Sequence, residues 1–108
     1  MRNKMDAALQ RCYRAVPPAH LRDLAPARGV LALRCTRTGC IACADFETDG
    51  RIAYEERLRG AETRGVTIRR WNCDVPELRD LARAAGVTDL PAYVLVRPSG
   101  DVTVRAVT

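Results

Sequence analysis

The most chemically informative feature of the sequence is a C-x-x-C motif formed by Cys40 and Cys43, two of the five cysteines. The motif follows the apolar run at 30–33, which is typical of a buried strand, and it stands where a helix is expected to begin. A thiol at a helix N-terminus faces the positive end of the helix dipole and unpaired amide groups, both of which stabilise a thiolate. A second thiol one turn later can attack a mixed disulfide formed on the first. We therefore expect Cys40 to be the exposed nucleophile and Cys43 to be the more buried resolving thiol.

The elements that position this motif are predicted from hydrophobic spacing and from helix and turn signals. An Asp49-Gly50 break is expected inside the helix that follows the motif, and Asp74 with Glu77 is expected to form a capping box at the next helix. The predicted order is helix 4–16, helix 19–24, strand 30–33, helix 43–64, strand 66–71, helix 75–85, strand 92–97 and strand 102–107. This order predicts an α/β fold of parallel βαβ units closed by a C-terminal β-hairpin.

Composition narrows the class of protein. A chain of 108 residues is about one domain long, so we expect a single domain, with an N-terminal helical segment at 1–28 and a core at 29–108. The net charge of +5 comes from scattered arginines, and aromatic residues make up only 5%, so a nucleic-acid surface is not expected. No apolar run reaches the length of a membrane span, and no secretion signal is visible, so we expect a cytoplasmic protein without membrane contact.

Residues 29–107 resemble the thioredoxin family. The resemblance rests on the buried strand before Cys40 and Cys43, on Asn72-Cys73-Asp74 after the next strand, on the segment ending in Leu90-Pro91, and on the hairpin turn at 98–101. It implies a thioredoxin-like fold with a central mixed sheet of about four strands flanked by helices. It also implies that Pro91 is a cis-proline facing the disulfide, and that the backbone of Leu90 pairs with an extended substrate peptide.

The sequence departs from this family in several places. Gly39 stands where most members have tryptophan, Ile-Ala stands between the cysteines instead of Gly-Pro, and the family's buried acid has no counterpart in the strand. Arg34 or Arg37 is instead available to stabilise a Cys40 thiolate. The usual C-terminal helix is missing, so we expect the extra N-terminal helix at 4–16 to cover part of the sheet. Otherwise the open face would favour a homodimer or another partner.

Cys35 and Cys73 end two strands that are parallel neighbours in a thioredoxin-like sheet, so both are expected at the edge where Cys40 emerges. Three interpretations remain open for them: small buried apolar residues, a second and regulatory disulfide, or a four-thiolate zinc or iron–sulfur site made with Cys40 and Cys43. Only one C-x-x-C is present, so we predict no metal and no other cofactor. Cys12, on an apolar stripe, is expected in the core.

The predicted function is that of a thiol–disulfide oxidoreductase, with Cys40 and Cys43 as the redox-active pair acting on disulfide-containing protein substrates. Turnover needs an external reductase or thiol donor as a partner. Two alternatives remain open. One is a thioredoxin-like binding or assembly module with inert cysteines, which the missing tryptophan, acid and final helix favour. The other is a domain that holds a metal through its cysteine thiolates.

Overall fold

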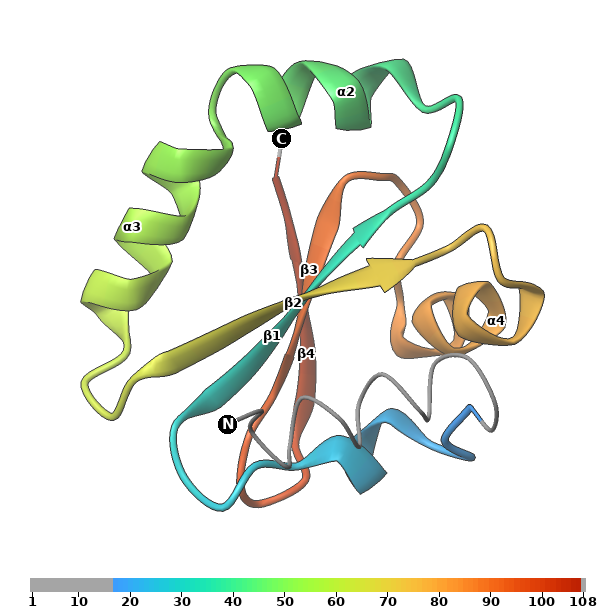
Figure 1. Cartoon of the computed structure of the whole chain (residues 1–108). Helices are drawn as coiled ribbons and strands as arrows, with labels where there is room; N and C mark the ends of the chain where they lie inside the picture. The colour runs from blue at the N-terminus through green and yellow to red at the C-terminus, as the bar shows by residue number, and fades with distance from the viewer. Residues whose placement is uncertain (1–16, 108) are drawn as a thin grey trace, which may run out of the picture.

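The computed structural model describes residues 17–107 and shows an α/β fold in which helices lie on both sides of a four-stranded mixed sheet (Figure 1). The strand order is β2-β1-β3-β4, with β1 parallel to β2, β1 antiparallel to β3, and β3 antiparallel to β4. The elements in chain order are the 3-10 helix η1 (Leu21–Leu24), β1 (Val30–Thr36), α2 (Ile41–Thr48), α3 (Arg51–Ala61), β2 (Val66–Asn72), α4 (Pro76–Ala85), β3 (Ala92–Val96) and β4 (Val102–Ala106).

The predicted mixed sheet and C-terminal hairpin are therefore confirmed. The predicted helix at 4–16, with Cys12, lies outside the described residues. No helix within 17–107 combines the length and the apolar character that a bilayer crossing requires.

Strand β1 lies in the middle of the sheet and carries the site. It is flanked by β2 and β3, and every residue in it except Arg34 is buried. Its side chains alternate between the two faces, so Leu31, Leu33 and Cys35 point toward α4, while Val30 and Ala32 point toward α2 and α3. Burial on both faces explains the unbroken apolar run in the sequence.

Two apolar layers hold the helices against the sheet. On one side, η1 and α4 contribute Leu21, Leu78 and Ala82 to a cluster with Trp71, whose Nε1 donates to the Leu78 carbonyl at 2.8 Å. Trp71 is fully buried, as expected of a core residue. On the other side, Phe46 packs edge-on against the Tyr93 ring, with ring centroids 6.1 Å apart. Figure 1 shows α2 and α3 on one side of the sheet and α4 on the other.

Two local predictions have different outcomes. The break at Asp49-Gly50 is confirmed, since α2 ends before Asp49 and Gly50 has a φ of 120°. The prediction of a capping box between Asp74 and Glu77 is wrong. Val75 is the N-cap of α4, and its side chain makes no capping hydrogen bond. Pro76 begins this helix with a preset φ and no amide hydrogen to satisfy, and the Asp74 carboxylate is bound elsewhere.

Candidate functional site

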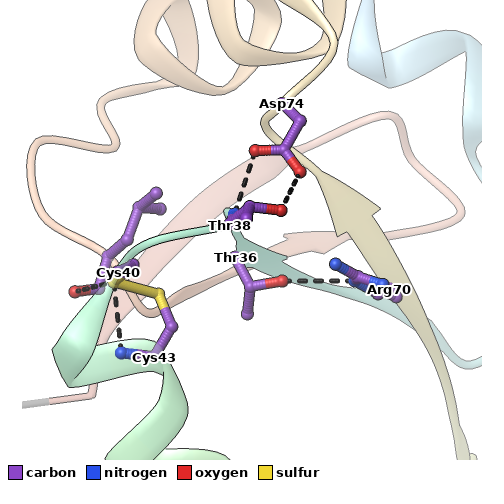
Figure 2. The surroundings of a disulfide bond; sticks show 7 residues. Thr36, Thr38, Cys40, Cys43, Arg70 and Asp74 are labelled. Carbon is purple, nitrogen blue, oxygen red and sulfur yellow. Dashed lines mark hydrogen bonds between the residues drawn. A yellow bond between two sulfur atoms is a disulfide. The ribbon is translucent and has the colours of Figure 1, made fainter.

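A disulfide between Cys40 and Cys43 stands at the start of α2, just beyond the carboxyl end of β1 (Figure 2). Their Cα atoms are 5.2 Å apart. Cys40 is the N-cap of α2, and its Sγ accepts a hydrogen bond of 3.1 Å from the backbone amide of Cys43. Cys40 is half-buried, whereas Cys43 is only 3% exposed. The first sulfur of the motif is thus the more accessible one, and it sits where a helix stabilises negative charge.

The Leu90-Pro91 segment faces this disulfide. The Leu90–Pro91 peptide bond is cis, as the resemblance implies. The Leu90 carbonyl oxygen lies 3.8 Å from the Cys40 sulfur, although the two residues are separated by 50 positions in the chain. Pro91 is buried and Leu90 is half-buried. The fold therefore brings together the predicted redox pair and the predicted peptide-binding segment.

The loop between β1 and Cys40 is anchored to the end of β2 (Figure 2). The Asp74 carboxylate accepts hydrogen bonds from the Thr38 amide at 2.9 Å and from the Thr38 hydroxyl at 2.6 Å, and these bonds hold the pKa of Asp74 below its ordinary value. Nearby, Arg70 Nε donates to the Thr36 hydroxyl at 3.3 Å. Sequence reasoning missed this anchor because it assigned Asp74 to a helix cap.

Cys35 and Cys73 are buried free thiols at the same edge of the sheet. The Cys73 amide donates to the Thr36 carbonyl at 2.9 Å, which continues the β1–β2 ladder by one residue. Interaction with the Cys73 sulfur, together with burial, raises the pKa of Cys35. The pKa of Cys73 is lowered, because interaction with the Cys35 side chain and the charges of Arg79 and Arg37 outweigh its own burial. The two thiols are therefore neighbours, as expected.

Two pockets flank Cys40, and both are rich in arginine. The smaller one, of about 270 Å³, is lined by Cys40 and Cys73 together with Arg37, Arg79, Arg83, Asp89 and Leu90, among others. The larger one, of about 450 Å³, lies along the motif and is lined by Cys40 and Cys43 together with Arg34, Arg37, Arg70 and Glu47, among others. This positive surrounding stabilises a thiolate that forms on Cys40.

An ion-pair network centred on the buried Glu55 lies beside the larger pocket. Arg34 binds Glu47 at 3.0 Å and Glu55 at 2.8 Å, and Glu55 also accepts a 2.6 Å hydrogen bond from the Tyr93 hydroxyl. Burial would raise the pKa of Glu55, which is 4% exposed, but the hydrogen bonds from Tyr93 and Arg34 outweigh that effect and lower it. Glu55 also pairs with Arg51 one turn earlier in α3. The buried acid beside this site is thus Glu55 of α3, and its cationic partner Arg34 belongs to β1.

This network distinguishes Arg34 from Arg37, the two arginines that were predicted as candidates for stabilising a Cys40 thiolate. Arg34 is held by two carboxylates, so its charge is largely neutralised. Arg37 is exposed and lines both pockets beside Cys40. Sequence reasoning did not identify Glu55, whose only signal is an ordinary Arg51–Glu55 spacing on a helix.

Within residues 17–107, no three histidine, cysteine or acidic side chains are gathered in a way that could hold a metal ion. The four-thiolate alternative therefore has no geometric support in that part of the chain. No protein-family model matches the chain, and no curated protein matches its sequence. The function is accordingly inferred from the geometry around Cys40.

Proposed function

We propose that this chain is a thiol–disulfide oxidoreductase with a thioredoxin-like fold, in which Cys40 and Cys43 exchange disulfides with protein substrates. The observation that carries the proposal is a vicinal cysteine pair at a helix start, with the more accessible sulfur next to the Leu90 carbonyl. The mixed sheet with a central β1, helices on both faces and a cis Leu90–Pro91 bond supports the thioredoxin-like assignment.

In the proposed reaction, the reduced protein attacks with the Cys40 thiolate on one sulfur of a substrate disulfide. A Cys40–substrate bond forms, the substrate disulfide breaks, and the departing substrate thiolate takes a proton from solvent. The Cys43 sulfur, after losing its proton, then attacks Cys40 Sγ and releases the second substrate thiol. The substrate gains two electrons, and the protein is left with the Cys40–Cys43 disulfide. An external reductase or thiol donor restores the dithiol.

The surroundings of Cys40 support each step. The amide of Cys43 and the arginine-lined pockets stabilise the attacking thiolate. The Leu90 backbone, close to the Cys40 sulfur, offers an edge along which an extended peptide can lie. Cys43 is shielded from solvent, so it meets a substrate only after Cys40 has formed the mixed disulfide.

The test is reduction of insulin by dithiothreitol in the presence of the protein. We expect Cys40→Ser to lower the rate to the uncatalysed level. The double variant Cys43→Ser with Cys73→Ala removes both thiols that line a pocket with Cys40, so it should lose turnover and accumulate a mixed disulfide on Cys40, which mass spectrometry detects. Cys12→Ser, a cysteine far from the motif in sequence, is the matched control and should keep the wild-type rate. Full activity of Cys40→Ser would show the mechanism to be wrong.

A thiol count and metal analysis of the purified protein separate this proposal from its alternatives. Loss of thiols from Cys40 and Cys43 on mild oxidation, without bound metal, agrees with the oxidoreductase. No change in the thiol count indicates a binding or assembly module. Stoichiometric metal indicates a metal-holding domain.

A further inference from the structure

We propose that Cys35 and Cys73 form a second redox pair that exchanges electrons with the Cys40–Cys43 disulfide inside the same chain. The inference rests on the proposed function of Cys40 and extends it to all four cysteines of the described residues. Those four sulfurs come from the ends of β1 and β2 and from the start of α2, which meet at one edge of the sheet.

The first supporting observation is that Cys35 and Cys73 belong to one buried cluster and are shielded from solvent. Cys35 lies on β1 and Cys73 directly follows the adjacent parallel strand β2, and both belong to the buried cluster beneath α4. Cys35 is 0% exposed and Cys73 is 2% exposed. A large disulfide from solution cannot reach either thiol, so a reaction partner for them has to lie within the protein.

The second observation is that Cys73 reaches the site through the smaller pocket. Cys40 and Cys73 both line this pocket of about 270 Å³. Cys35, which lies behind Cys73, does not line the pocket. Because Cys73 lines the pocket and Cys35 does not, we assign Cys73 as the thiol that attacks the Cys40–Cys43 disulfide and Cys35 as the thiol that attacks Cys73 in turn.

The third observation is the charge around Cys73. Arg37, Arg79 and Arg83 line the pocket, and within residues 17–107 their side chains form neither ion pairs nor hydrogen bonds. Interaction with the Cys35 side chain and the charges of Arg79 and Arg37 lower the pKa of Cys73. Because Cys73 lines this arginine-rich pocket and Cys35 does not, we assign the first attack to Cys73 and the second to Cys35.

The exchange proceeds in two balanced steps. The Cys73 thiolate attacks Cys40 Sγ, so that a Cys73–Cys40 bond forms, the Cys40–Cys43 bond breaks, and Cys43 leaves as a thiolate. Cys43 then takes up the proton that Cys35 gives up through solvent. The Cys35 thiolate attacks Cys73 Sγ, forms a Cys35–Cys73 bond and releases Cys40 as a thiolate. Two electrons pass from one pair to the other, and no outside reagent is consumed. The fully reduced protein can therefore reduce two substrate disulfides before an external reductase or thiol donor has to reduce it again.

The experiment uses the full chain with Cys12→Ser and Cys43→Ser, loaded on Cys40 with one equivalent of nitrothiobenzoate as a mixed disulfide. We expect first-order release of the coloured thiolate, with a rate constant that is independent of protein concentration. Because the Cys73 thiol is held in place beside Cys40, this rate should be about 100-fold higher than in the same protein with Cys73→Ala added. Peptide mapping should then find Cys35 linked to Cys73. With Cys35→Ala in place of Cys73→Ala, the reaction should stop at a Cys40–Cys73 link.

Equal release with and without Cys73 would overturn the relay while leaving the proposed function intact. Failure of Cys40 to accept the label would instead refute the proposed function, and the relay with it. A measurement on the unsubstituted protein avoids any folding defect of the variants. After exhaustive oxidation by cystamine, a Cys35–Cys73 linked peptide is expected, and two thiols left free at these positions would refute the relay.

Discussion

Replacement of Glu55 by glutamine is expected to destabilise the protein strongly. The Glu55 carboxylate accepts hydrogen bonds from Arg34 at 2.8 Å, Arg51 at 3.2 Å and the Tyr93 hydroxyl at 2.6 Å, and it is 4% exposed. Removal of one partner from a buried ion pair costs about 3–5 kcal/mol. Both arginines keep Glu47, so we expect a loss near the lower end, about 3 kcal/mol.

The assay is urea unfolding followed by the fluorescence of Trp71, the only tryptophan in the chain, which is fully buried. With a slope of about 1.5 kcal/mol per molar urea, a loss of about 3 kcal/mol lowers the midpoint by about 2 M. Glu56→Gln is the matched control, because Glu56 is the next residue of α3 and is exposed. Its free energy of unfolding should stay within about 0.5 kcal/mol of the wild type, which is a midpoint shift of at most about 0.3 M.

The pH dependence of stability gives a second test of the contribution of Glu55. The pKa of Glu55 is lowered in the folded protein, so its stabilisation is fully present above the ordinary value of 4.5 and is lost as the pH falls through the lower, folded-state value. The gap between wild type and Glu55→Gln should therefore be constant near neutral pH and should narrow below pH 4.5. A Glu55→Gln midpoint equal to that of Glu56→Gln at pH 7 would refute the network's role.

Two further substitutions, each with a control substitution, test the packing of the fold. Gly29→Ala places a Cβ 2.8 Å from the Gly65 carbonyl oxygen at a φ of 73°, so we expect a loss of about 3 kcal/mol in the same urea assay. Gly39→Ala, with a φ of 78° and open space around the new Cβ, should lose only about 1 kcal/mol, and equal losses would contradict the steric reasoning. Phe46→Ala removes a ring packed against Tyr54 and Tyr93 and should cost about 3 kcal/mol. Ile52→Ala, at a side chain 65% exposed, should stay within about 0.5 kcal/mol, and a larger effect there would mean that this face of α3 is covered.

The order of elements could be predicted from the sequence because its signals are local. The apolar run of β1 reflects burial on both faces, the Asp49-Gly50 break ends α2, and Gly86 ends α4 in a left-handed conformation. The place of Cys40 and Cys43 at a helix start follows from the same short-range pattern. Each of these signals depends on residues within one or two turns of each other, so the sequence displays them directly.

The surroundings of the cysteines depended on tertiary structure. Arg34 and Glu55 are 21 positions apart, Thr38 and Asp74 are 36 apart, and Tyr93 and Glu55 are 38 apart. A carboxylate binds whichever donor the packed sheet and helices bring within about 3 Å. The spacing of residues along the chain therefore does not predict its partner. For this reason Asp74 was assigned to a cap, Glu55 went unnoticed, and the pocket shared by Cys40 and Cys73 became visible only in the folded chain. The sequence by itself determined the C-x-x-C pair and the elements that carry it, whereas the tertiary structure decided which charges and which further thiol lie near that pair.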